Sequence, residues 1–150
     1  MNKLEFGNNI ESKYIQRNVS HTDIENEIKD KLKKAKESSS FNSFSEYFWS
    51  LPNVKALSDS EIIKLSGIEK SYYYQIKKGK RSPGRDKIIR LCIGTKLTVQ
   101  ETTHALELSE YAVLYSRNRR DIILTVAINR QLTVIDTNLL LDKYNEKPLL

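Results

Sequence analysis

The sequence predicts an all-α protein, and three observations lead to this fold class. Among 150 residues there are only three Pro and five Gly, so residues that interrupt helices are scarce. Apolar residues recur at spacings of three and four, which is the pattern of one face of a helix. Several of these segments also begin with Ser or Thr three residues before an acid, which is typical of a helix N-terminus.

Residues 1–42 are predicted to form an N-terminal arm that carries one charged helix. Residues 1–20 show no sustained periodicity, so we expect them to be flexible. A helix over residues 22–36 is indicated by one narrow apolar stripe. The stripe consists of Ile24, Ile28, Leu32 and Ala35. Such a helix is marginal alone, so we expect it to pack on the main domain, to pair with a second copy, or to fray.

The globular part of the chain is predicted to begin at Ser43. Ser43 and Glu46 have the spacing of a capping box, and an inward apolar face follows them. Its members are Phe44, Tyr47, Phe48 and Leu51. Pro52 is expected to end this helix, because Pro disfavours helical backbone in the residue before it. The single Trp49 is predicted to pack against the N-terminal helix.

Two short helices separated by a tight corner are predicted next, at residues 60–65 and 70–77. Ser58 and Glu61 form a capping box before the first of them. Gly67 stands where the chain leaves that helix with positive φ, a conformation that glycine adopts at little cost.

In the second of these helices the two faces differ in character. Tyr73 and Ile76 are three residues apart and are predicted to face inward. The outward positions are then Lys70, Ser71, Tyr74, Gln75 and Lys78. This helix therefore presents a polar, cationic side to its surroundings.

Residues 67–83, GIEKSYYYQIKKGKRSP, resemble the motif of the Xre/Cro-type, lambda-repressor-like helix-turn-helix family. The shared features are an apolar residue after the first Gly and an ending of the form I-x-x-G-K-x-x-P. The resemblance covers residues 43–107 and implies a five-helix bundle whose helix over residues 70–77 enters the major groove of DNA. Two positions depart from the family pattern. Ile63 stands where Ala is preferred, and Asp59 stands where a polar or basic residue often touches phosphate.

The same resemblance implies which side chains contact DNA. Base edges are assigned to Lys70, Ser71, Tyr74 and Gln75. Phosphate contacts are assigned to Tyr72, Lys77, Lys78, Lys80, Arg81 and Arg85. Lys is suited to guanine and Gln to adenine, because each can bond two atoms of the base edge. Phosphate contacts instead supply salt-dependent affinity without sequence information. Tyr73 occupies a core position and is assigned to the interior.

The positive charge of the chain is concentrated around this motif. The formal net charge is +6. Residues 55–90 hold ten Lys or Arg against four acids, and the remaining chain holds fifteen of each. The whole excess therefore lies on the predicted motif and its exit, which favours a polyanion as the partner.

The C-terminal part of the sequence contains an internal repeat. Residues 85–114 align without gaps on residues 120–149, at a spacing of 35. Each copy is predicted to form helix, short turn and helix, with Thr98 and Thr133 as the N-caps of the second helices. The predicted helices are residues 86–93, 99–106, 121–129 and 134–141. The first copy then completes the bundle, and the second adds a hairpin within residues 108–150. Chance likeness between amphipathic helices is the alternative explanation.

A second basic cluster consists of Arg117, Arg119 and Arg120. It can touch DNA backbone beside the main site, or it can be a solvated connector in which Arg120 pairs with an acid. The second interpretation is favoured, because Arg120 corresponds in the repeat to Arg85 and this indicates a structural role common to both copies.

The sequence does not indicate an enzyme, a metal site or a cofactor. His21 and His104 lie in unlike contexts, and Cys92 stands in an apolar run that predicts a buried thiol. Catalytic motifs and phosphate-binding glycine loops are absent from the sequence. The single cysteine indicates a reducing compartment, and no apolar run is long enough to cross a bilayer, so we expect a cytoplasmic protein.

Two functions are consistent with these observations. The first is sequence-specific binding of double-stranded DNA by a transcriptional regulator, acting as a homodimer through the N-terminal helix or the hairpin. The second is a protein–protein interaction adaptor on a helix-turn-helix scaffold that has lost DNA binding, with its partner on the C-terminal hairpin.

Overall fold

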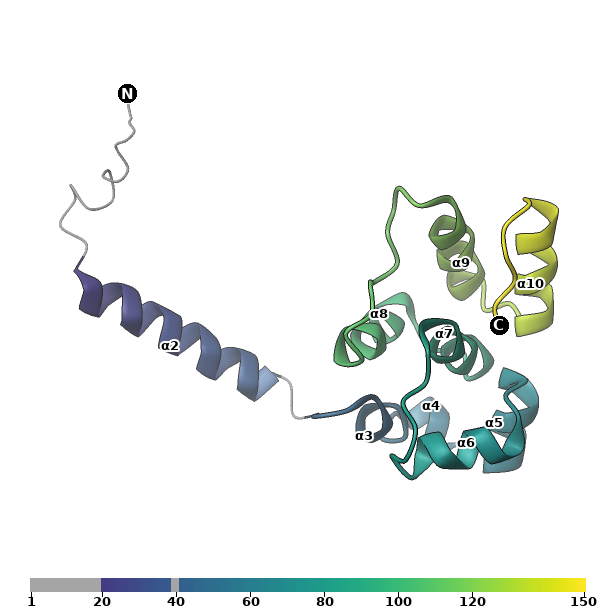
Figure 1. Cartoon of the computed structure of the whole chain (residues 1–150), viewed down its shortest axis with the longest axis horizontal. Helices are drawn as coiled ribbons and strands as arrows, with labels where there is room; N and C mark the ends of the chain where they lie inside the picture. Colours follow the sequence, from purple (N-terminus) through teal and green to yellow (C-terminus); the bar gives the residue numbers. More distant parts are fainter. Residues whose placement is uncertain (1–19, 39–40) are drawn as a thin grey trace. The chain divides into compact units, whose positions relative to one another are not determined.

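The computed structural model describes residues 20–38 and 41–150, which form nine helices and no strand (Figure 1). The prediction of an all-α fold is therefore confirmed for these residues. The chain divides into two compact units, Met1–Ser40 and Phe41–Leu150. The flexible segment predicted at residues 1–20 lies, apart from Ser20, outside the described residues. None of the described helices has the length and hydropathy needed to span a membrane.

The first unit contains the helix α2, His21–Ser38, close to the predicted range of 22–36. Its N-terminus is capped by Ser20, whose hydroxyl accepts a hydrogen bond of 3.1 Å from the Asp23 amide. Its apolar stripe is largely open to solvent, since Ile28 is 52 % exposed and Leu32 is 64 % exposed.

The second unit begins with four short helices that surround the predicted corner. They are α3 (Phe44–Phe48), α4 (Pro52–Lys55), α5 (Asp59–Ser66) and α6 (Lys70–Lys77). The helix predicted after Ser43 and the helices predicted at residues 60–65 and 70–77 agree with α3, α5 and α6 to within a few residues. The helix α4 was not predicted. Pro52 does follow an extended residue, as expected, but it also opens a new turn of helix at its first position, where its missing N–H costs nothing.

Four longer helices follow and form two consecutive pairs. They are α7 (Arg85–Gly94), α8 (Val99–Leu108), α9 (Arg119–Asn129) and α10 (Val134–Lys143). The helices within each pair pack together, and the pairs also contact each other through α7 with α10 and α8 with α9.

A single hydrophobic core joins all parts of the second unit. Phe48 of α3, Tyr73 of α6 and Leu91 of α7 have no exposed surface, and the same holds for Leu124 and Leu141 of the last helix pair. Residues 108–150 therefore belong to the same compact unit as residues 41–107.

The position of Trp49 corrects one prediction. Its indole N–H donates to the Tyr73 hydroxyl at 3.2 Å, and its ring packs edge-on against Phe44, Phe48 and Tyr73. These partners lie within the second unit and differ from the N-terminal helix that was predicted. The reason is that Trp49 ends α3 on the side that faces α6, a relation that the sequence does not show.

The two copies of the repeat share their backbone conformation as well as their sequence. Positive φ occurs at Lys96 and Glu110 in the first copy and, 35 residues later, at Gln131 and Asn145. Thr98 and Thr133 cap the second helix of each copy, as predicted. The equivalence therefore extends to the turns, where chance likeness between helices would not produce it.

A crossed pair of ion pairs joins the two copies. Arg85 binds both carboxylate oxygens of Asp121 at 3.2 and 3.0 Å, and Arg120 binds both oxygens of Asp86 at the same distances. The reciprocal pattern is that of a local two-fold relation. Each arginine also donates to two loop carbonyls of its own copy, which are Ala112 and Val113 for Arg85, and Lys147 and Pro148 for Arg120.

Candidate nucleic-acid interface

The turn before α6 is built as the sequence predicts. Ser58 and Glu61 form the capping box of α5, and Gly67 ends that helix at φ +68°. A side chain at Gly67 would collide with the guanidinium of Arg90, which donates to the Ser66 carbonyl at 2.9 Å. Glycine at this corner is thus favoured by its left-handed backbone conformation, and a side chain there would also displace the Arg90 guanidinium.

The inner face of α6 is held by a chain of polar contacts. The buried Tyr73 donates to Asp59 at 2.7 Å, and Lys77 forms an ion pair with the same oxygen at 2.7 Å. The bond from Lys77, followed by that from Tyr73, holds the pKa of Asp59 below its ordinary value. Burial, with the bond to Asp59, raises the pKa of Tyr73. Ser45 adds a bond of 2.8 Å to the Ile76 carbonyl. These contacts fix α6 against α3 and α5.

The N-terminus of α6 is capped by Glu69. Its carboxylate accepts hydrogen bonds of 3.0 Å from the amides of Ser71 and Tyr72, and these bonds lower its pKa. Two of the amides that a helix start offers to an anion, those of Ser71 and Tyr72, are therefore already in use. A ligand approaching this end of α6 meets side chains instead.

The outward face of α6 brings the predicted base-contact residues together. Lys70, Ser71, Tyr74 and Gln75 all line one open depression, together with Glu69, Lys78 and Lys80. The three lysines of this depression are exposed, and none forms an ion pair with any described residue. The depression thus combines three unpaired positive charges with the donors and acceptors of Ser71 and Gln75.

Gln75, at the edge of the depression, contacts a small cluster formed by Arg81, Tyr72 and Lys87. The Arg81 guanidinium donates to the side-chain oxygen of Gln75 at 2.7 Å and lies 4.9 Å from the centre of the Tyr72 ring. Lys87 lies 5.7 Å from the same ring. Tyr72 therefore supports two cations by cation–π contact, and its ring is half-buried.

Two residues predicted to contact phosphate have other roles in the structure. Lys77 is engaged with Asp59, and Arg85 is engaged with Asp121 and two carbonyls. Neither lines the depression on α6. For Arg85 the repeat already contained the signal, because its counterpart Arg120 makes the equivalent contacts.

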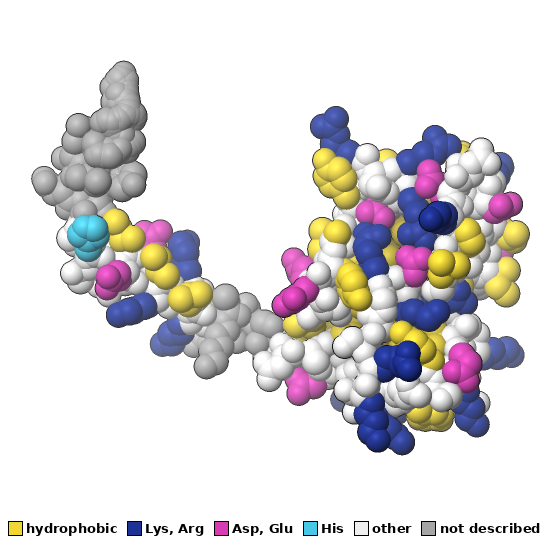
Figure 2. All heavy atoms as spheres, viewed as in Figure 1, with side chains coloured by type: hydrophobic (Ala, Val, Ile, Leu, Met, Phe, Trp, Pro, Cys, Tyr) yellow, Lys and Arg dark blue, Asp and Glu magenta, His cyan; other side chains and the backbone are white. Residues whose placement is uncertain are grey.

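The charge distribution around α5 and α6 agrees with the depression being cationic. Figure 2 shows more Lys and Arg than Asp and Glu side chains at the end of the second unit that contains these helices, at the bottom of the view. Two of the nearby acids, Asp59 and Glu69, are committed to a lysine and to helix amides. The unpaired charge on this side is therefore mostly positive.

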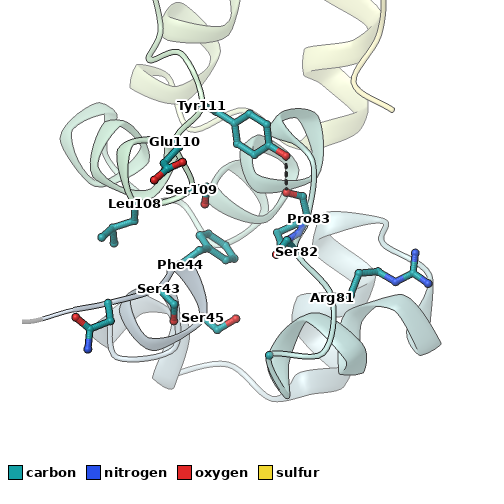
Figure 3. A pocket seen from close by; sticks show the side chains of 12 residues that line it. Ser43, Phe44, Ser45, Arg81, Ser82, Pro83, Leu108, Ser109, Glu110 and Tyr111 are labelled. Atoms are coloured by element: carbon teal, nitrogen blue, oxygen red, sulfur yellow. Dashed lines mark hydrogen bonds between the residues drawn. The ribbon is translucent and has the colours of Figure 1, made fainter.

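The segment that leaves α6 is held at its far end. Tyr111 donates to the Pro83 carbonyl at 3.2 Å across a small cleft (Figure 3). Ser43, Phe44 and Leu108 line other walls of the same cleft. This contact positions the 79–83 segment, which carries Lys80 and Arg81 beside α6.

The described residues contain no group of three His, Cys, Asp or Glu side chains arranged to hold a metal. Cys92 is fully buried, and burial raises the pKa of its thiol to about 12. His104 packs its ring edge-on against Tyr47 at 4.6 Å. These residues have packing roles in the second unit.

The C-terminal hairpin exposes a second kind of surface, which is apolar. Ile122, Val126 and Tyr144 line a hollow with Leu140, and each of these three is about half exposed. Arg119 lies at its edge, where it pairs with Glu146 at 3.3 Å. Arg117 and Arg119 of the predicted basic cluster therefore border an apolar face, whereas Arg120 is paired with Asp86.

Three features of the site were not predicted from the sequence. They are the Asp59–Lys77 pair, the cap by Glu69 and the bond between Arg81 and Gln75. Glu69 had a weak signal, since it directly precedes the helix, but Ser, Thr, Asp and Asn are the usual caps. The other two join residues on different elements, so no local pattern marks them.

Comparison with known protein families, with curated proteins and with solved structures finds no match to this chain.

Proposed function

We propose that residues 41–150 bind double-stranded DNA in a sequence-specific manner as a transcriptional regulator, with α6 in the major groove. The observation that carries this proposal is the outward face of α6. It presents the predicted base-contact residues and three unpaired lysines on one open surface, while its inner face is locked against α3 and α5. A rigidly held helix with a free polar face is what groove recognition requires.

The roles of the side chains follow from their positions. Lys70 and Ser71 in the first turn of α6, and Gln75 one turn further on, are assigned to base edges. Lys78 and Lys80, near its end, are assigned to phosphates. In the free protein Arg81 occupies the side-chain oxygen of Gln75. We therefore expect Arg81 to move onto a phosphate when Gln75 bonds adenine, because that pairing uses both the oxygen and the nitrogen of the amide.

Selection of bound sequences from a random DNA pool at two salt concentrations tests the proposal. The expected result is enrichment of one defined sequence at both concentrations. Weak binding that disappears at the higher salt concentration, with no enriched sequence, would contradict it.

Variants separate the two kinds of contact. Lys70→Ala or Gln75→Ala should change the preferred base at one position, with a loss of about 1–3 kcal/mol on the selected sequence. Lys80→Ala should weaken binding to all sequences and reduce the slope of log K against log salt by about 1. Lys143→Ala, on α10, is the matched control and should do neither. Equal losses on selected and random DNA for the first three variants would refute this division of roles.

A second function, a protein-interaction adaptor, is favoured by the exposed apolar side chains of the hairpin. Ile122, Val126 and Tyr144 form a continuous hollow rather than isolated exposed residues. Failure of the DNA selection, together with loss of a protein partner in an Ile122→Asp variant, would favour this function instead.

A further inference from the structure

The helix α2 carries an apolar row that is largely exposed and has no partner among the described residues of its own unit. Figure 2 shows the apolar side chains of α2 in a single row along the helix. Ile24 is partly exposed, Ile28 is 52 % exposed and Leu32 is 64 % exposed. An isolated helix of 18 residues is marginal in water, so a row of this kind is stabilised by a second apolar row.

The charges beside this row follow a definite order. At 3.6 residues per turn, Glu25 and Lys29 lie along one edge of the row, and Glu27 and Lys31 lie along the other. Each edge therefore has its acid towards the N-terminus and its base towards the C-terminus. All four side chains are exposed.

This order selects the direction in which two copies of α2 can pair. In an antiparallel pair related by a two-fold axis at Ile28, each edge faces the same edge of the other copy in reverse. Along each edge this gives two Glu–Lys neighbours and one like-charged pair beside the axis, which is Lys29 with Lys29 on one edge and Glu27 with Glu27 on the other. In a parallel pair, opposite edges meet at the same height, which gives one Glu–Lys neighbour, Glu27 with Lys29, between a Glu25–Glu27 contact and a Lys29–Lys31 contact. The antiparallel pair therefore has more contacts between opposite charges and fewer between like charges. Like charges at those distances are unfavourable.

We propose that α2 associates with α2 of a second copy of this chain as an antiparallel pair. Ile28 meets Ile28 at the axis, and Ile24 meets Leu32 on either side of it. The apolar contact is small, so association is weak and depends on the flanking charges, which makes it sensitive to salt. The proposal stands on α2 alone and does not depend on DNA binding by the second unit.

Charge exchange tests the pairing. The double variants Glu25→Lys/Glu27→Lys and Lys29→Glu/Lys31→Glu are made in the full chain and examined by sedimentation equilibrium. Each variant alone should be monomeric at a concentration where the unaltered chain dimerises. An equimolar mixture should restore the dimer, because one chain then offers only acids and the other only bases. If these charges only stabilised the single helix, mixing the two variants would not restore the dimer.

The apolar axis has its own test. Ile28→Ala should raise the dimer dissociation constant by about tenfold or more, because the same side chain is lost from both copies. Asn26→Ala, which is exposed on the opposite side of α2, is the control and should leave the constant unchanged.

Cross-linking decides the direction. A mixture of Ile24→Cys chains and Leu32→Cys chains should form a disulfide between the two kinds of chain, whereas Ile24→Cys alone should form none. Cys92 is buried and does not compete. A disulfide formed by Ile24→Cys alone would overturn the antiparallel arrangement, and a monomeric full chain at millimolar concentration would overturn the association itself.

Discussion

The two copies of the repeat are alike where they face each other and different on their outer sides. Between them, Arg85 and Arg120 make equivalent contacts across a local two-fold relation. On the outside, the first copy is covered by α3 and α5, which pack on α8 and α7. The second copy has no such cover among the described helices of its unit.

Equivalent positions show the consequence of this difference. Leu91 is completely buried, whereas Val126, its counterpart 35 residues later, is 50 % exposed. Gly94 lies against the backbone of α5, whereas its counterpart Asn129 is exposed. One repeat unit thus serves as the support of the proposed DNA-binding helices in its first copy and as an open surface in its second.

The largest difference in mutational effect between the two copies is expected at Leu91 and its counterpart Val126. Leu91→Ala should lower the free energy of unfolding by about 3 kcal/mol, because it leaves a cavity in the core. Val126→Ala should lower it by less than about 1 kcal/mol, because half of that side chain is already in water. Urea unfolding of both variants measures the contrast. Equal losses would show that the outer face of the second copy is covered in solution.

Variants of the crossed ion pairs probe the contact between the two copies of the repeat, where the copies are equivalent. Asp121→Ala should cost about 2–4 kcal/mol, since its carboxylate is 8 % exposed and its removal leaves Arg85 without a counter-charge. Asp86→Ala should cost less, because that carboxylate is 24 % exposed. Thermal unfolding at neutral pH compares the two variants, with Arg117→Ala as an exposed control. A larger loss for Asp86→Ala would contradict this order.

A smaller effect is expected where α5 approaches α7. A Cβ at position 94 would meet backbone atoms of Leu65 and Ser66 at 3.0 Å. Gly94→Ala should therefore destabilise the protein by about 1–2 kcal/mol even though Ala favours helix. Asn129→Ala should be neutral or slightly stabilising. A higher unfolding midpoint in urea for Gly94→Ala would contradict the close approach of α5 to α7 at this position.

The smallest effect is expected at His104 and its counterpart Leu139. His104 packs against Tyr47, whereas Leu139 is 63 % exposed. His104→Ala should cost about 1 kcal/mol, and Leu139→Ala should be within about 0.5 kcal/mol of the unaltered protein. Differential scanning calorimetry resolves such a difference through the unfolding midpoint. If only Leu139→Ala lowered the free energy of unfolding, the outer side of the second copy would be the covered one, contrary to the structure.

Most helices could be predicted because their signals are local. Capping residues and apolar spacing placed α5, α6 and the four repeat helices to within about two residues of their observed ends. The short α4 was missed because Pro52 is both a terminator for the residue before it and a good first residue of a helix. Which of these effects dominates depends on the packing of Val54, which is buried.

The candidate site could be predicted in outline only. The outward face of α6 follows from helical periodicity, so Lys70, Ser71, Tyr74 and Gln75 were expected to lie together, and they do. The engagement of Lys77 by Asp59 could not be foreseen, because the two residues are 18 apart in the chain. For Arg85, the repeat indicated a structural role, and the identity of its partner came only from the structure.

By itself the sequence determined the helical class, the α5–α6 corner, the cationic face of α6 and the repeat of 35 residues, because each depends on neighbours within a few turns of chain or on direct likeness between segments. Only the tertiary structure decided which arginines and lysines are consumed by internal pairs, and which copy of the repeat is covered. Those outcomes depend on the approach of elements far apart in sequence, where burial and geometry, rather than residue type, select the partner.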